Sequence, residues 1–118
     1  MDRRAAGLKG EEIAAGFLKK EGYRILERNF RCKHGEIDLI AEKEGVICFI
    51  EVKARSTYRF GFPEEAITSY KRKRIWAVAL FYLQKNKIKS RDLRFDIVSV
   101  DLKTHKARLI QNAFEVDF

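Results

Sequence analysis

The chain has 118 residues, of which 46% are hydrophobic and 36% are charged, and its net charge is +8. This length predicts one globular domain over residues 1–118. No apolar run approaches the roughly 20 residues that span a bilayer, and the first residues lack the apolar stretch of a secretory signal, so we expect a cytoplasmic protein without a membrane partner.

The first half of the chain predicts a helix followed by strands. Residues 8–21 have the apolar spacing of an amphipathic helix, with Leu8 in its stripe, and Gly22 ends it. Residues 23–30 are typical of a strand. Residues 36–42 and 46–53 are two further strands separated by a short turn, so they predict a β-hairpin.

The second half predicts a loop, a long helix and two strands. Residues 54–62 are expected to be the loop, and Pro63 can open a helical turn after it. Thr68 or Ser69 then caps a helix that extends to about residue 87. The buried stripe of this helix is expected to be Ile75, Trp76, Ala79, Leu80 and Leu83.

The last two strands are expected at residues 93–100 and 107–111. The order is then a helix, three strands, a helix and two strands. Alternation of this kind predicts an α/β sandwich with a mixed five-stranded sheet.

Charged residues inside apolar strands are the most informative feature of the chain. Asp38 lies in the first strand of the hairpin, and Glu51 and Lys53 lie in the second. Charges are rare in such segments unless they are paired or bind a metal. The alternative is a solvated ion pair between Glu51 and Lys53, but the apolar residues that flank them make it the weaker interpretation.

Strand alternation assigns these residues to faces of the sheet. In the first hairpin strand it separates Glu36, Asp38 and Ile40 from Ile37, Leu39 and Ala41. In the second strand, Glu51 and Lys53 share a face. A hairpin register can bring Asp38 to the same face, although the sequence does not fix that register.

This constellation fits the hydrolysis of a phosphodiester. Mg²⁺ prefers oxygen ligands and usually takes one or two protein carboxylates together with water. Asp38, Glu51 and the Val52 carbonyl are therefore candidate ligands of Mg²⁺ or Mn²⁺. Lys53 could orient the attacking water or stabilise developing negative charge.

The basic residues favour a polyanionic partner, such as nucleic acid or an anionic membrane surface. The run Lys71, Arg72, Lys73 and Arg74 lies in the first turns of the second helix, where cations are unfavourable, so a phosphate partner is more credible than a solvated face. Arg55 follows the motif lysine closely and is a further candidate for a phosphate contact.

The motifs resemble the PD-(D/E)xK, or restriction-endonuclease-like, nuclease superfamily. More narrowly, the chain is similar to the YraN-type family of small bacterial proteins, which are distant relatives of archaeal Holliday junction resolvases. The landmarks are Gly10-Glu11, Gly35-Glu36-Ile37-Asp38, Glu51-Val52-Lys53, Lys71, Arg74-Ile75 and Arg94-Phe95-Asp96. Ile37 departs from the superfamily pattern, which has a proline at this position.

The resemblance implies a three-layer α/β/α sandwich and assigns roles to individual residues. It makes Asp38 and Glu51 the metal-binding acids and Lys53 the motif lysine, and it adds Glu11 from the first helix as a further catalytic acid. Glu11 has an alternative role as a partner of the helix dipole, which Glu12 would serve equally well.

The expected function is a metal-dependent endonuclease that acts on DNA. The resolvase resemblance implies a branched or structured substrate and a homodimer. Two alternatives stay open: a non-catalytic nucleic-acid-binding module that retains the nuclease fold, and an adaptor that binds a protein or an anionic surface through its basic helix.

Overall fold

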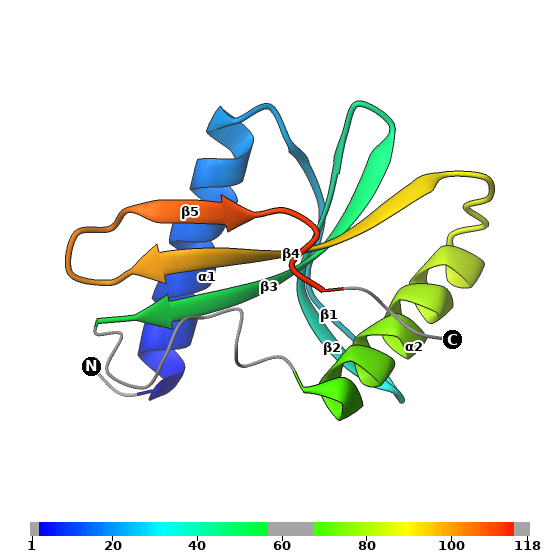
Figure 1. Ribbon diagram of the computed structural model, residues 1–118, viewed down its shortest axis with the longest axis horizontal. Coiled ribbons are helices and arrows are strands. Elements are labelled where there is room, and N and C mark those ends of the chain that lie inside the picture. The colour runs from blue at the N-terminus through cyan, green and yellow to red at the C-terminus, as the bar shows by residue number, and fades with distance from the viewer. Residues whose placement is uncertain (1–2, 57–67, 115–118) are drawn as a thin grey trace.

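The structure is a computed structural model that describes residues 3–56 and 68–114. Its elements follow the predicted order (Figure 1): α1 (Arg3–Lys20), β1 (Arg24–Cys32), β2 (Gly35–Lys43), β3 (Val46–Arg55), α2 (Ser69–Lys85), β4 (Asp92–Asp101) and β5 (Ala107–Ile110). Within the described residues, no helix is long and apolar enough to cross a membrane.

The five strands form one mixed sheet in the order β1-β2-β3-β4-β5. Neighbours pair antiparallel except β3 and β4, which are parallel. A parallel pair needs a long crossover connection, and α2 lies in the connection between these two strands. The predicted α/β class and mixed sheet are confirmed.

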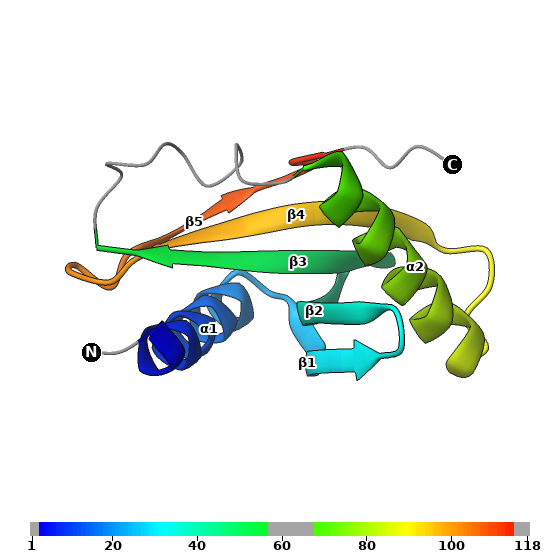
Figure 2. The same ribbon diagram turned by 90° about the horizontal axis from the view of Figure 1, so that it is seen from below.

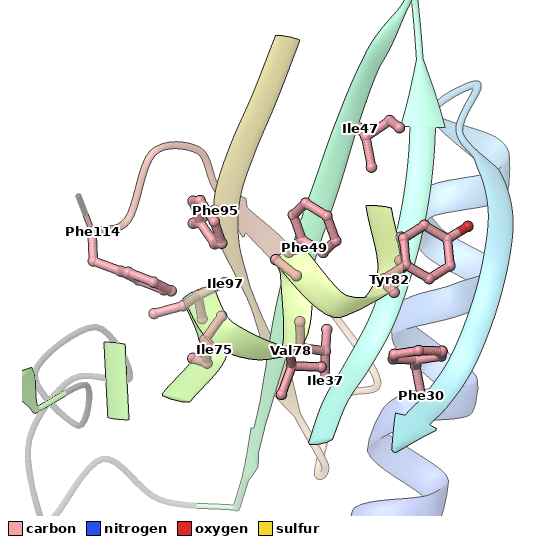
Figure 3. Packing of buried hydrophobic residues seen from close by; sticks show 12 residues of the cluster. Phe30, Ile37, Ile47, Phe49, Ile75, Val78, Tyr82, Phe95, Ile97 and Phe114 are labelled. Atoms are coloured by element: carbon pink, nitrogen blue, oxygen red, sulfur yellow. The ribbon is translucent and has the colours of Figure 1, made fainter. Parts of the chain in front are cut away.

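The two helices pack against opposite faces of the sheet. Ala14, Ala15 and Leu18 of α1 belong to one cluster of buried residues. Buried residues of α2 belong to a second cluster, in which Ile75, Val78 and Tyr82 surround Phe49 and its neighbours (Figure 3). The helices also lie toward opposite ends of the strands (Figure 2). These three layers are compatible with a restriction-endonuclease-like sandwich.

Helix α1 begins at Arg3, five residues before the predicted start. The added turn is rich in arginine and alanine, which are good helix formers but carry no apolar periodicity. Leu8, expected in the buried stripe, is 56% exposed, because it lies about 120° around the helix from Ala14. Gly22 ends the helix as predicted, with a φ of +90°.

Helix α2 begins after Thr68, whose hydroxyl accepts a hydrogen bond from the Lys71 N–H. It ends at Lys85, two residues before the prediction. The prediction that Leu80 is buried is wrong, since this side chain is 38% exposed. The buried positions are Ile75, Val78, Ala79 and Tyr82, which follow the i, i+3, i+4, i+7 spacing.

Strand β3 runs on to Arg55, so Ala54 and Arg55 belong to the sheet and not to the predicted loop. Both residues pair with the end of β4, and these ladder bonds extend the strand beyond its apolar pattern. The rest of the predicted loop, and the helical turn predicted at Pro63, fall in residues 57–67 and lie outside the described residues.

Candidate metal centre

Asp38 lies where β2 and β3 part. The two strands pair from Lys43 and Val46 as far as Leu39 and Ile50, where their register ends. Beyond that point the Val52 N–H donates a hydrogen bond of 2.8 Å to Asp38 Oδ2. A side-chain carboxylate thus takes the place of a backbone acceptor. We call the place where β2 and β3 separate, beyond Leu39 and Ile50, the fork, and Asp38 lies inside it.

The fork also breaks the predicted alternation of β2. Ile37 was expected to share a face with Leu39, but Ile37 and Ile40 both pack in the α2-side cluster, while Leu39 packs in the α1-side cluster. Past the fork β2 pairs with β1 and no longer with β3, so it can twist away from β3. Glu36, expected on the face of Asp38, forms an ion pair with Arg31 at 2.8 Å.

Glu51 reaches the site from β3 and is only 7% exposed. Its Oε2 lies 3.7 Å from Lys71 Nζ of α2, which is an ion pair and too long for a hydrogen bond. Two residues along the strand, Lys53 has its pKa lowered to about 8, first by burial and then by the nearby Lys71. The charge of Lys71 therefore acts on both Glu51 and Lys53.

The two acids are short of compensating positive charge. Burial, followed by the charge of Asp38, raises the pKa of Glu51 to about 7. Burial also raises the pKa of Asp38, although the Val52 N–H opposes this shift. A divalent cation between the carboxylates would supply the missing charge, so the residues present fit such an ion.

The ligands available are few. Among the described residues, no group of three or more His, Cys, Asp and Glu side chains is arranged to hold a metal. With two carboxylates as ligands, backbone oxygens and water would have to complete the coordination shell of the ion, as is usual for Mg²⁺. The Val52 carbonyl suits this role, since the N–H and C=O of a strand residue face the same edge and the Val52 N–H faces Asp38.

Glu11 of α1 lines the same cleft as Asp38. The cleft has a volume of about 320 Å³, and its walls are Ala6, Gly7, Glu11, Asp38 and residues 52–55. Burial raises the pKa of Glu11, the Asn29 side chain opposes this shift, and the charge of Asp38 adds to it. The fold therefore brings Glu11 near Asp38, as the resemblance implied, from the helix on the other side of the cleft.

The run of four basic residues does not form one surface. Lys71 faces Glu51, whereas the Arg72 guanidinium lies 6.0 Å from the Phe114 ring. Lys73 and Arg74 line a separate shallow groove. Successive helix residues are about 100° apart, so a run that is contiguous in sequence points in several directions.

Two arginines have buried nitrogens that are not satisfied. The Nε atoms of Arg55 and Arg72 are buried and lack a hydrogen-bond partner among the described residues. Arg55 lines the cleft that also holds Asp38 and Lys53.

Sequence reasoning missed the residues that share the groove with Lys73 and Arg74. They are Lys33 and His34, from the turn between β1 and β2, and Tyr70, from the first turn of α2. None of these three residues belongs to a motif in the sequence. The signal in the sequence is a tyrosine directly before the basic run.

Comparison with known proteins places the chain in an uncharacterised group. A sequence model described as "Uncharacterised protein family UPF0102" matches residues 10–100. The chain is 47% identical over 118 residues to a UPF0102 protein of Caldicellulosiruptor saccharolyticus, covering 97% of this chain and 100% of that relative. It is 48% identical over 115 residues to a UPF0102 protein of Clostridium botulinum, covering 93% and 94%. The names of these two relatives state no activity.

Proposed function

The chain belongs to the uncharacterised protein family UPF0102, and from its site we propose that it is a metal-dependent endonuclease that hydrolyses phosphodiester bonds in DNA. This family is the YraN-type family that the motifs resemble. The observation that carries the proposal is the buried pair of acids, Asp38 and Glu51, beside a lysine whose pKa is lowered to about 8. Membership of the nuclease superfamily is part of the proposal.

Asp38, Glu51 and the Val52 carbonyl would hold Mg²⁺ or Mn²⁺. When bound, such an ion lowers the pKa of a bound water and stabilises charge on the phosphate oxygens. The fork orients the Asp38 carboxylate for this task, because the Val52 N–H donates a hydrogen bond to one of its oxygens. Lys71 offsets part of the negative charge of Glu51 from the α2 side.

Lys53 and Arg55 would act on the phosphate. Lys53 remains mostly protonated at neutral pH, since its pKa is about 8, and in that form it can stabilise negative charge as the bond breaks. Arg55 lines the same cleft and would add positive charge near the phosphate. A preference for branched DNA follows from the resolvase resemblance, which is an analogy of fold.

The test is a cleavage assay with pure protein on linear, flapped and four-way DNA, with EDTA, Mg²⁺ or Mn²⁺. We expect metal-dependent cutting of at least one substrate, and losses of 100-fold or more, on the order of 3 kcal/mol of activation free energy, for Asp38→Asn and Glu51→Gln. No cutting of any DNA under any metal condition would count against the proposal.

Neighbouring acids on α1 provide a matched control. Glu11 lines the cleft and Glu12 is exposed outside it. Glu11→Gln is therefore expected to reduce cutting, whereas Glu12→Gln leaves it at the wild-type rate. Equal rates for the two variants would show that Glu11 takes no part in cutting. The helix-dipole role does not apply, because α1 begins at Arg3 and its first turn contains no acid.

The second candidate is a nucleic-acid-binding module without catalysis. It is favoured by the small ligand set, because no group of three or more His, Cys, Asp and Glu side chains among the described residues could hold a metal. It predicts salt-sensitive DNA binding that survives Asp38→Ala and Glu51→Ala, with no uptake of metal. Calorimetric titration of Mn²⁺ into wild-type protein separates the two candidates, since only the nuclease requires a metal.

A further inference from the structure

A basic groove with an exposed tyrosine lies beside the candidate metal centre. It has a volume of about 390 Å³ and is formed where the turn between β1 and β2 meets the first half of α2. Its lining residues are Lys33, His34, Tyr70, Lys73, Arg74 and Ala77. None of these described lining residues is acidic, so the groove is complementary to an anionic ligand.

Tyr70 is held in place although it is exposed. It is 68% exposed, the most of any large hydrophobic side chain that the structure describes. Arg74 Nη1 donates a 2.9 Å hydrogen bond to the Tyr70 hydroxyl, and the guanidinium lies 5.6 Å from the ring centroid. A ring fixed in this way loses little conformational entropy when a ligand packs on it.

The opposite wall of the groove is tied to the same arginine. Arg74 Nε donates a 3.2 Å hydrogen bond to the His34 carbonyl. Gly35 has a φ of +139°, and a Cβ there would lie 3.3 Å from Arg74 Nη2, so glycine gives the arginine room. Arg74 therefore joins the turn to α2 and orients Tyr70, while Lys33 and Lys73 supply charge on the two sides.

The groove adjoins the metal centre through α2. Tyr70 precedes Lys71, the residue that forms the ion pair with Glu51. Tyr70, Lys73, Arg74 and Ala77 follow the i, i+3, i+4, i+7 spacing and so share one side of the helix. A DNA strand bound at Asp38 and Glu51 can therefore reach Tyr70 by crossing the first turn of α2.

We propose that this groove binds an unpaired stretch of DNA next to the metal centre, with one base stacked on Tyr70 and the phosphates held by Lys33 and Lys73. An open tyrosine face can stack on a base only when that base is not already stacked inside a duplex. The inference rests on the proposed function and names its substrate form, which is DNA with a single-stranded segment beside the bond to be cut.

The test measures binding without cleavage, in EDTA, by fluorescence anisotropy. The probes are a labelled oligothymidylate of about 12 nucleotides and a blunt duplex of the same length. Tyr70→Ala is expected to weaken binding of the single strand about 5-fold or more and to leave duplex binding unchanged. Tyr70→Phe keeps the stacking surface and is expected to bind close to wild type.

Leu80→Ala is the matched control, because Leu80 is also an exposed apolar side chain of α2 but lies outside the groove. It is expected to bind both probes like wild type. Lys33→Gln and Lys73→Gln should weaken binding of both probes. For the single strand, each substitution should make the slope of log K against log salt concentration less steep by about 0.7. Thermal melting of each variant confirms that it is folded.

A direct readout of stacking uses a strand that contains 2-aminopurine. Wild-type protein should quench its fluorescence, and Tyr70→Ala should lose most of the quenching. Single-strand affinity and quenching that survive Tyr70→Ala would overturn the inference, as would an equal loss for duplex and single strand.

The outcomes separate this inference from the proposed function. If single-strand binding depends on Tyr70 but the protein cuts no DNA, the result supports the proposed DNA-binding groove and overturns the proposed nuclease function. If cutting of both flapped and blunt DNA depends on Asp38 but not on Tyr70, the result supports the proposed nuclease function and overturns the proposed DNA-binding groove.

Discussion

Three acids lie within apolar strands, and their partners distinguish them. Asp96 is fully buried, but Arg94 Nε lies 3.0 and 2.9 Å from its two carboxylate oxygens. Glu51 is nearly as buried and has only Lys71 at 3.7 Å. Asp38 accepts one backbone hydrogen bond. Asp96 is therefore paired with an arginine within the fold, whereas Asp38 and Glu51 lack such a partner among the described residues, and a cation would stabilise their charged forms.

The raised pKa of Glu51 predicts a pH-dependent stability in metal-free buffer. Between about pH 4.5 and 7 the folded protein keeps a proton on Glu51 that the unfolded chain releases. The unfolded state binds fewer protons in this window, so the free energy of unfolding should fall as pH rises through it. Glu51→Gln cannot ionise, and its stability relative to wild type should rise across the window by about 3 kcal/mol.

Urea unfolding at several pH values in EDTA measures this difference. Glu44→Gln, a change in the exposed turn between β2 and β3, should track wild type at every pH. Parallel curves for wild type and Glu51→Gln would show that Glu51 is not protonated in the folded state.

At the scale of elements, the close packing of α1 on β3 brings Glu11 to the cleft. A Cβ placed on Gly10 would lie 2.3 Å from the Ala54 Cβ, so only glycine allows this approach. Glu11 follows directly and lines the cleft with Asp38. The packing of one glycine therefore sets the distance between an acid on a helix and the acids on the strands.

Two glycines of the same helix give a matched pair of substitutions. Gly10→Ala is expected to destabilise the protein by about 1–3 kcal/mol through overpacking. Gly16, where an added Cβ meets nothing within 4 Å, should gain about 0.5–1 kcal/mol on substitution by alanine. Urea unfolding measures both changes. Rescue of Gly10→Ala by Ala54→Gly would identify the contact, and a neutral Gly10→Ala would show that α1 can move away at no cost.

At the scale of the molecule, a buried polar network joins three distant segments. Arg94 of β4 binds Asp96 and donates a 2.8 Å hydrogen bond to the Tyr23 hydroxyl, at the start of the β1 region. Asp96 also accepts a 2.9 Å hydrogen bond from the Asn112 N–H, after β5. The network thus ties the residue before β1 and the segment after β5 to β4.

Removal of Asp96 should weaken the whole fold. Asp96→Ala leaves Arg94 without its carboxylate, and breaking a buried ion pair in this way costs about 3 kcal/mol. Asp92→Ala, at the exposed start of the same strand, should change stability by no more than about 0.5 kcal/mol. Urea unfolding measures the midpoints of the two variants, and midpoints report stability directly when the m-values are equal. Similar midpoints would mean that the network contributes little to stability.

Element order and the main site residues follow from local patterns in this chain. Apolar periodicity and turn residues placed two helices and five strands, and the charges within apolar strands singled out Asp38, Glu51 and Lys53. These signals depend on residues close together in sequence, since a helix cap or a hairpin turn is set by its neighbours. The errors at Leu8 and Leu80 arose where a stripe had to be placed on one side of a helix, which depends on what the helix packs against.

Other features depended on contacts between segments that are distant in sequence. The fork at Asp38 exists because pairing between β2 and β3 stops at Leu39 and Ile50, and a local pattern does not encode where a ladder ends. Asp96 carries the same local pattern as Glu51, and only its arginine partner separates a structural acid from a candidate ligand. The groove at Tyr70 is formed by a turn and a helix far apart in the chain, so it exists only after the sheet and α2 have packed.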